Sequence, residues 1–155
     1  VKKFPNLIVT RSFSKIFALG GLRIGWGYSN KKIIDRLYSF KKPFNVSRLS
    51  CIAAEESLKN KTWIKKSISN NFLNKDFAIK SLINPSFKVI DTEANFILLK
   101  FKNSKISEKF VNFLYKNKVT VRSLTSYGLP NYVRMTIGTK ADMKRASLIS
   151  NKFNV

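Results

Sequence analysis

The sequence predicts an α/β protein, because short apolar runs typical of buried strands alternate with longer stretches in which apolar residues recur every three or four positions. The 155 residues are 44% hydrophobic and 25% charged, which is enough apolar material for a core and an ordinary charge content for a soluble domain. Four of the six glycines fall between residues 20 and 27, so tight packing or a ligand is expected there more than elsewhere.

The first part of the sequence predicts two strands and one helix. Residues 6–10 form a β-branched apolar run that leads into a polar turn, and residues 23–27 predict a second strand whose glycines allow a close backbone approach. A helix is predicted from Asn30, a candidate N-cap, up to Pro43. We place a domain boundary near residue 45, so that residues 1–44 form the first predicted domain.

Residues 45–155 form the second predicted domain, with linking helices followed by a compact α/β unit. Ser47 is a candidate cap for one helix, and the spacing of Ile64, Ile68 and Phe72 predicts a longer amphipathic helix. The remaining predicted elements are strands 87–91 and 95–101, a helix with Ile106, Phe110, Phe113 and Leu114 on one face, strands 119–121 and 132–137, and a last helix opened by a capping box of Thr139 and Asp142.

The formal net charge of +22 makes a nucleic-acid-binding module an alternative from another functional class. The lysines, however, are scattered through nearly every segment rather than gathered on one stripe. Lys, Asn, Ile and Phe are all abundant and all have A/T-rich codons, so genome composition accounts for the basicity without selection for binding. A steep loss of affinity with rising salt is the behaviour that would distinguish a genuine nucleic-acid binder.

Composition also bears on redox chemistry, metals and membranes. The single cysteine, Cys51, forms no internal disulfide, and we expect it to be a small core residue. Without any histidine the sequence offers no Cys/His cluster for zinc, so no metal site is predicted. The apolar runs are too short to cross a bilayer and no signal segment opens the sequence, so we expect a cytoplasmic protein.

The most informative segment runs from Ser12 to Gly25. It places Ser12, Ser14 and Lys15 in the turn after the first predicted strand, with Arg23 eight residues after the lysine. An amine on a flexible stem can form an imine with an aldehyde and can afterwards carry protons. Two hydroxyls and a guanidinium fork suit a phosphate dianion, and glycines let the backbone approach it.

This pattern, Ser-Phe-Ser-Lys and then Arg-Ile-Gly, resembles the cofactor-lysine motif of fold-type I aminotransferases, which depend on pyridoxal 5'-phosphate. The resemblance implies that Lys15 carries the cofactor as a Schiff base and moves the substrate proton as general base and acid. It also implies that Ser12, Ser14 and Arg23 hold the cofactor phosphate. A lone lysine among thirty basic residues is usually a solvated surface residue, and only the whole pattern favours the catalytic interpretation.

Later motifs resemble the histidinol-phosphate aminotransferase family within this group. They are Pro-Phe-Asn-Val at 43–46, Glu-Ala-Asn-Phe at 93–96, Val-Arg-Ser-Leu at 121–124, Tyr-Gly-Leu-Pro at 127–130 and Val-Arg-Met-Thr-Ile-Gly-Thr at 133–139. By this resemblance, one or both of Arg122 and Arg134 grip the phosphate of histidinol phosphate and the distal or α-carboxylate of glutamate. The implied reaction moves an amino group between L-histidinol phosphate and 2-oxoglutarate in histidine biosynthesis. A threonine-phosphate decarboxylase or an aromatic aminotransferase stays open as an alternative.

The resemblance extends over nearly the whole sequence but over only the second half of the family's chain. The implied fold is the end of the large-domain sheet of a fold-type I transferase together with its small C-terminal α/β domain. The groups that contact the pyridine nitrogen and cradle the phosphate come earlier in the family, and this sequence opens with Val1 rather than Met. We therefore expect a fragment that is inactive alone, from an enzyme that is a homodimer in its full-length form.

Overall fold

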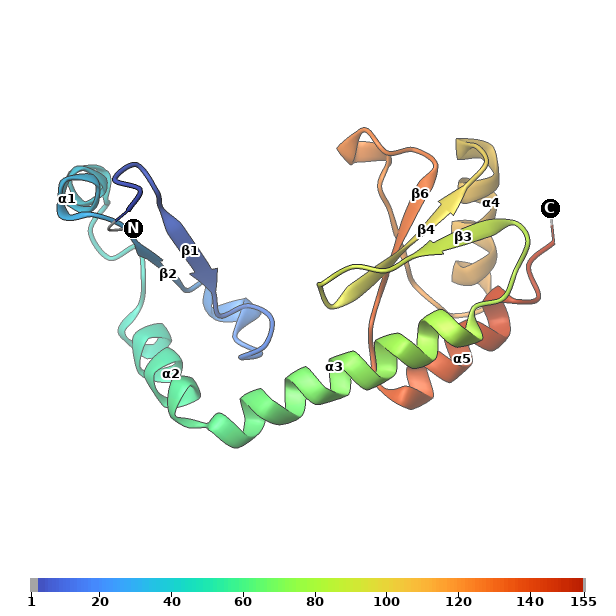
Figure 1. Cartoon of the computed structure of the whole chain (residues 1–155), viewed down its shortest axis with the longest axis horizontal. Helices are drawn as coiled ribbons and strands as arrows, with labels where there is room; N and C mark the ends of the chain where they lie inside the picture. The colour runs from blue at the N-terminus through green and yellow to red at the C-terminus, as the bar shows by residue number, and fades with distance from the viewer. Residues whose placement is uncertain (1–2, 155) are drawn as a thin grey trace. The chain divides into compact units, whose positions relative to one another are not determined.

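The computed structural model describes residues 3–154 of the protein. The chain divides into two compact units, Val1–Ile68 and Ser69–Val155. Figure 1 labels the helices of both units and all strands except β5. The domain boundary near residue 45 stays a prediction, because compactness alone does not define a domain that folds by itself.

In the first unit, strand β1 (Val9–Ser12) pairs antiparallel with strand β2 (Gly25–Tyr28). Both predicted strands are found, displaced toward the C-terminus. Gly25 permits this pairing, since a Cβ at this position would lie 2.6 Å from the carbonyl oxygen of Arg11 on the neighbouring strand. A short 3-10 turn, η1 (Gly20–Leu22), lies in the connection between the two strands. The glycine-rich segment therefore shapes the loop that follows β1.

Three helices follow β2. Helix α1 (Lys31–Phe40) is capped by Asn30, whose side chain accepts a main-chain N–H at 3.0 Å, and helix α2 (Arg48–Lys59) is capped in the same way by Ser47. Both predicted N-caps are confirmed. Helix α3 (Lys61–Ser81) begins in the first unit and ends in the second.

The buried face of α3 differs from the predicted one. Ile68 and Phe72, which belong to the predicted apolar stripe, are exposed in the described structure, whereas Lys75 and Ala78 are buried. The helix itself is confirmed. A helix that carries apolar residues on more than one side has no single periodic stripe, so spacing alone selects its packed face poorly.

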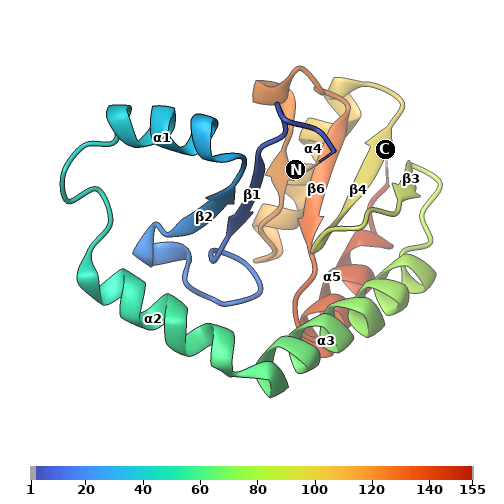
Figure 2. The ribbon, with the colours of Figure 1, turned by 60° about the vertical axis from the view of Figure 1, so that its left-hand side comes forward.

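The second unit contains a four-stranded antiparallel sheet with the strand order β3-β4-β6-β5. Figure 2 shows β3, β4 and β6 side by side. The strands are β3 (Phe87–Ile90), β4 (Phe96–Phe101), β5 (Arg122–Ser123) and β6 (Tyr132–Thr136). Three predicted strands are found here, but the strand predicted at residues 119–121 is wrong. Val119 donates its N–H to the carbonyl of Leu114 at 2.9 Å, so it closes the end of the preceding helix and the strand starts only at Arg122.

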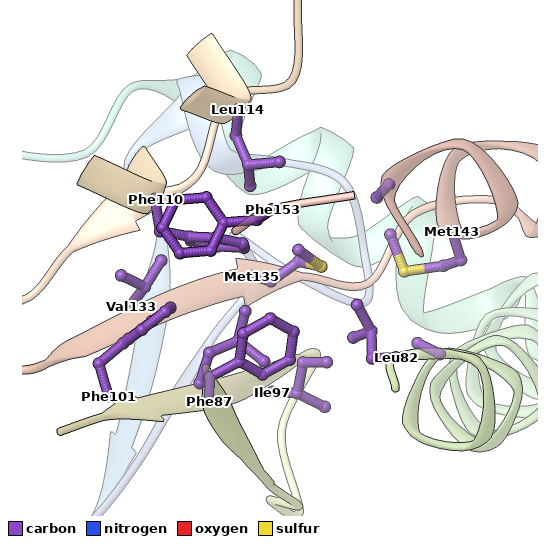
Figure 3. Close-up of a cluster of buried hydrophobic side chains, with 13 residues drawn as sticks. Leu82, Phe87, Ile97, Phe101, Phe110, Leu114, Val133, Met135, Met143 and Phe153 are labelled. Atoms are coloured by element: carbon purple, nitrogen blue, oxygen red, sulfur yellow. The ribbon is translucent and has the colours of Figure 1, made fainter. Parts of the chain in front are cut away.

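Alternate residues of this sheet face a hydrophobic core on one side (Figure 3). Helix α4 (Ser104–Lys116), helix α5 (Lys140–Ser150) and the end of α3 supply the other side of this core. The ring of Phe110 from α4 lies 5.0 Å from that of Phe101 and 5.2 Å from that of Phe153, in tilted and edge-on arrangements that aromatic pairs favour. The buried core residues of the strands are Phe87, Ile97, Leu99, Phe101, Val133 and Met135.

The sheet face opposite this core carries a mixture of apolar and cationic side chains. Leu98, Arg134 and Arg122 are direct neighbours across β4, β6 and β5. Because successive side chains of a strand point to opposite faces, Arg134 projects away from its buried neighbours Val133 and Met135. The core thus fixes the strands that present the two arginines.

Cys51 is exposed on α2, so the prediction of a core cysteine is wrong. This helix buries Ser50 and Ala54, which share one face of the helix, and Cys51 lies next to that face. Within residues 3–154, no helix is long and apolar enough to cross a membrane. The same residues contain no group of three or more His, Cys, Asp or Glu side chains that could hold a metal ion.

The predicted capping box at the start of α5 is confirmed. The N–H of Asp142 donates to the Thr139 hydroxyl oxygen at 3.2 Å, and the Asp142 carboxylate accepts the Thr139 N–H at 2.9 Å. The Thr139 hydroxyl also donates to this carboxylate, and these hydrogen bonds lower the pKa of Asp142. A carboxyl group with a lowered pKa stabilises the fold above its unfolded pKa, and this contribution is lost as the pH falls through the native value.

We expect Thr139→Ala to lower the free energy of unfolding by about 1 kcal/mol at neutral pH, because the N-cap is lost. The difference from the unchanged protein should shrink as the pH falls through the lowered pKa of Asp142, since protonation weakens the same cap. Denaturant titrations at several pH values measure both effects. Thr120→Ala, which changes an exposed threonine in a loop, serves as the control. An equal loss in both variants would contradict this account of the cap.

Candidate active site

The Ser-Phe-Ser-Lys turn leaves the end of β1 and is anchored by its phenylalanine. Phe13 is 4% exposed, and its ring lies 4.9 Å from that of Phe17. Its N–H donates to the carbonyl of Ile24 at 3.2 Å, which ties the turn to the entry of β2. With Phe13 fixed inside, Ser12 and Lys15 on either side of it are exposed. The turn therefore exposes Ser12 and Lys15 on either side of an anchored phenylalanine.

Local hydrogen bonds set the shape of this turn. The Ser12 hydroxyl oxygen accepts the N–H of Ser14 at 3.0 Å, a short-range bond typical of serine in turns. The carbonyl of Lys15 accepts the N–H of Ala18 at 2.9 Å. Three of the four predicted cofactor-binding residues are thereby held in one tight segment: Ser12, Ser14 and Lys15.

Arg23, the fourth predicted cofactor-binding residue, adopts a left-handed backbone conformation with φ of 50°. Such a conformation costs a non-glycine residue about 1–2 kcal/mol, and residues kept in it are often functional. The Arg23 guanidinium donates from Nη1 to the carbonyl of Gly20 at 2.7 Å, which holds the side chain across η1. The strained backbone and this bond together keep an exposed guanidinium in a defined place.

Two side chains from the helices brace the loop between Lys15 and Arg23. The indole N–H of Trp63, at the start of α3, donates to the carbonyl of Ile16 at 2.8 Å. The hydroxyl of Ser50 on α2 donates to the carbonyl of Leu22 at 2.9 Å. Sequence reasoning did not find either contact, since partners 47 and 28 residues apart leave no local pattern.

The motif is positively charged and lacks a carboxylate partner within the described residues. None of the salt bridges found in residues 3–154 involves Lys15 or Arg23. An open hollow of about 500 Å³ borders the turn and is lined by Ser12 together with Arg11, Ile16 and Trp26, but not by Lys15 or Arg23. The cations are therefore available to an anionic group, while this hollow does not enclose the amine.

The second unit brings the two remaining predicted residues together. Arg122 and Arg134 are cross-strand partners on β5 and β6. Arg122 donates from Nη2 to the hydroxyl of Tyr127 at 3.1 Å, and its guanidinium lies 5.4 Å from the centre of that ring. The guanidinium of Arg134 lies 5.3 Å from the centre of the Phe96 ring. Each arginine thus rests on its own aromatic ring, as guanidinium groups commonly do.

This arrangement favours an anionic ligand. Like charges directly opposite each other on neighbouring strands destabilise a sheet. The Nε atom of Arg134 is buried and has no hydrogen-bond partner among the described residues, which is a cost that a ligand can remove. No salt bridge in residues 3–154 neutralises Arg122 or Arg134. The two predicted groups of site residues therefore form two cationic sites, one in each unit.

The family model and two curated relatives that match this chain are all aminotransferases. Residues 1–147 match the family model described as aminotransferase class I and II. The histidinol-phosphate aminotransferase of Campylobacter jejuni (strain RM1221) is 41% identical over 149 residues, which cover 94% of this chain and 39% of the relative. That of Leptospira interrogans (serogroup Icterohaemorrhagiae serovar Lai) is 39% identical over 136 residues, which cover 87% and 36%. The chain thus spans less than half the length of these relatives.

Solved structures of related enzymes share the fold of this chain. The histidinol-phosphate aminotransferase from Clostridium acetobutylicum matches 97% of this chain and 46% of its own, with a TM-score of 0.88 and 25% identity. The L-threonine-O-3-phosphate decarboxylase from Porphyromonas gingivalis matches 96% of this chain and 47% of its own, with a TM-score of 0.81 and 26% identity. The predicted fold, part of a fold-type I aminotransferase, is confirmed.

The cofactor of this family is pyridoxal 5'-phosphate. It is bound in the structure of a histidinol-phosphate aminotransferase from Sinorhizobium meliloti. That structure shares the fold, with a TM-score of 0.86 and 20% identity over 96% of this chain and 41% of its own. The first cationic site fits such a group by its chemistry. It offers an exposed amine on Lys15, two hydroxyls and the guanidinium of Arg23, and no carboxylate in the described residues is paired with these cations.

Proposed function

Because this chain belongs to the aminotransferase class I and II family, we propose that its full-length protein is a pyridoxal-phosphate-dependent aminotransferase acting on L-histidinol phosphate and 2-oxoglutarate. The observation that carries the proposal is the hydrogen-bonded turn that exposes Lys15, with Ser12 before it in the chain and the left-handed Arg23 after it. The identity of 41% to a histidinol-phosphate aminotransferase supports the choice of substrates. We further propose a cytoplasmic homodimer that serves histidine biosynthesis.

Lys15 carries the cofactor and moves a proton. Pyridoxal phosphate, when bound, supplies a reactive aldehyde and an electron-withdrawing ring. The Nζ amine of Lys15 would hold the cofactor through this aldehyde, with loss of water. Once the substrate amine has replaced it there, the free amine of Lys15 would take the proton from the amine-bearing carbon of the substrate. Phe13 anchors the turn, and Lys15 is exposed, so the amine would be accessible to both cofactor and substrate.

Ser12, Ser14 and Arg23 hold the cofactor phosphate. Hydroxyl donors and a guanidinium form charge-assisted hydrogen bonds with a dianion, which are stronger than bonds between neutral groups. The left-handed backbone of Arg23 and its bond to Gly20 fix the guanidinium before the ligand arrives, so little side-chain entropy remains to be lost.

Arg122 and Arg134 hold the anionic groups of the substrates. Histidinol phosphate carries a phosphate, and 2-oxoglutarate carries carboxylates. Both suit the bidentate geometry of guanidinium. The cross-strand placement of the two arginines and the unpartnered Nε of Arg134 support this role.

A related decarboxylase is the second candidate, because the structure of a threonine-phosphate decarboxylase matches this chain at 26% identity. The full-length protein, loaded with pyridoxal phosphate, should form glutamate from histidinol phosphate and 2-oxoglutarate under our proposal. The second candidate would instead release carbon dioxide from threonine phosphate. Failure to form glutamate with histidinol phosphate, while another amino donor or the decarboxylation proceeds, would contradict the proposed substrates.

A further inference from the structure

Lys75 is the only charged side chain among the buried residues of the described structure, with 8% of its surface exposed. A buried ammonium group is costly unless it is paired and hydrogen-bonded. Lys75 lies in the part of α3 that belongs to the second unit. Neither the cofactor nor the substrates require this amine in the reaction proposed above, so its burial calls for another explanation.

The ammonium group of Lys75 reaches the turn between β3 and β4. Its Nζ donates to the main-chain carbonyl of Thr92 and lies 2.8 Å from the carboxylate of Asp91. The hydrogen bond from Lys75 lowers the pKa of Asp91, which keeps this carboxyl group ionised at neutral pH. The lysine thereby joins the helix to the turn through one ion pair and one main-chain bond.

Two further side chains on the same face of α3 support this attachment. Asn71, one turn before Lys75, donates from Nδ2 to the carbonyl of Ala94 at 3.3 Å. Asn74 donates from Nδ2 to the carbonyl of Gly138, just after β6, at 3.0 Å. All three donors point at main-chain oxygens. The helix therefore holds both the entry of β4 and the exit of β6.

The clamped turn leads directly to the ring on which Arg134 rests. Phe96 is the first residue of β4, and its carbonyl accepts the hydroxyl of Thr92 inside the same turn. The carbonyl of Asn95 accepts the N–H of Ile137 at 2.9 Å, which ties the turn to the end of β6. The Phe96 ring then lies beneath the Arg134 guanidinium, 5.3 Å from its centre.

We propose that Lys75 is a positioning residue for substrate binding: it clamps the β3–β4 turn so that Phe96 holds the Arg134 guanidinium ready for the substrate anion. This inference rests on the proposed role of Arg134. It assigns α3 a part in anion binding through contacts that lie entirely within the second unit.

The test compares Lys75→Met and Asn71→Ala with Asn84→Ala in the full-length protein loaded with pyridoxal phosphate. Methionine keeps the length and the apolar stem of lysine but removes its charge and its donors. Asn84 is a matched control, since it is also 8% exposed and its side chain donates to the carbonyls of Ser150 and Phe153, which belong to α5 and the segment after it. Arg134→Ala shows how far the KM for 2-oxoglutarate rises when the proposed anion-binding guanidinium is removed.

We expect Lys75→Met and Asn71→Ala to raise the KM for 2-oxoglutarate about tenfold, which corresponds to about 1.4 kcal/mol of binding, while kcat changes less than about threefold. Asn84→Ala should leave this KM unchanged, even if it lowers the melting temperature as much as Lys75→Met does. In cofactor-free protein, amide hydrogen exchange of residues 91–97 should accelerate in Lys75→Met but not in Asn84→Ala.

Each outcome bears on the inference. A rise in KM that is equal in Asn84→Ala and Lys75→Met would assign Lys75 a general structural role and overturn the proposal. An unchanged KM in Lys75→Met and Asn71→Ala, with a clear rise in Arg134→Ala, would overturn it while leaving Arg134 in place. If Arg134→Ala itself changes nothing, the proposed function of Arg134 fails and this inference fails with it. If Lys75→Met does not fold, the KM of Asn71→Ala tests the clamp: an unchanged KM in this variant overturns the proposal.

Discussion

Replacing Lys15 by alanine in the full-length protein is expected to remove the visible absorbance of the bound cofactor and to lower kcat by about 10⁴-fold. The variant loses the covalent attachment, and it also loses a general acid and base, a step that contributes up to about 10⁴-fold by itself. Absorbance spectra of the reconstituted protein and steady-state rates of glutamate formation measure the two losses.

Lys32→Ala is the matched control for this experiment, because Lys32 is an exposed lysine in the first turn of α1 and lies outside the candidate site. It should keep both the absorbance and the rate. A Lys15→Ala protein that retains the absorbance and more than about a tenth of kcat would contradict the role of Lys15, since loss of one acid and base alone predicts a larger effect.

Loss of Arg23 is expected to weaken cofactor retention strongly. Arg23→Ala should raise the dissociation constant for pyridoxal phosphate by one to two decades, since a charge-assisted hydrogen bond contributes about 1.5–3 kcal/mol. Arg134→Ala should change this constant less than about threefold, because the proposal assigns Arg134 to the substrate. Equilibrium dialysis after removal of excess cofactor measures both, and equal losses in the two variants would contradict this division.

The left-handed backbone of Arg23 calls for one further variant. Alanine is strained at a φ of 50°, whereas glycine adopts this conformation freely. Arg23→Gly therefore removes the guanidinium without adding strain. If the guanidinium matters, the glycine and alanine variants should lose the cofactor to the same extent. If Arg23→Gly retains the cofactor as well as the unchanged protein does, the phosphate contact is not made by Arg23.

The sequence predicted correctly those features that depend only on residues close together in the chain. The caps at Asn30 and Ser47 and the capping box at Thr139 each depend on residues within one helical turn, and all three are confirmed. The Lys15 turn was singled out by its resemblance to a family motif of fixed residues and spacing, and its chemical role stays a prediction. The strand at residues 119–121 was wrong because Val119 closes the helix before it.

Features that depend on distant residues could not be predicted in this way. The periodic stripe of α3 pointed to Ile68 and Phe72, yet the buried face carries Lys75, whose partners Asp91 and Thr92 lie in a different element. A buried charge looks like an ordinary surface lysine until its partners are known. The aromatic ring that supports Arg134 was hidden for the same reason, since Phe96 and this arginine lie on different strands.

The central claim is that Lys15 carries the cofactor, and borohydride reduction of the cofactor-loaded full-length protein tests it most directly. Reduction fixes pyridoxal phosphate permanently to the lysine that holds it, and peptide mapping by mass spectrometry then identifies that residue. The account predicts a single modified peptide containing Ser12 to Arg23, with the added mass on Lys15. Stoichiometric modification of any other lysine, with Lys15 unmodified, would contradict it.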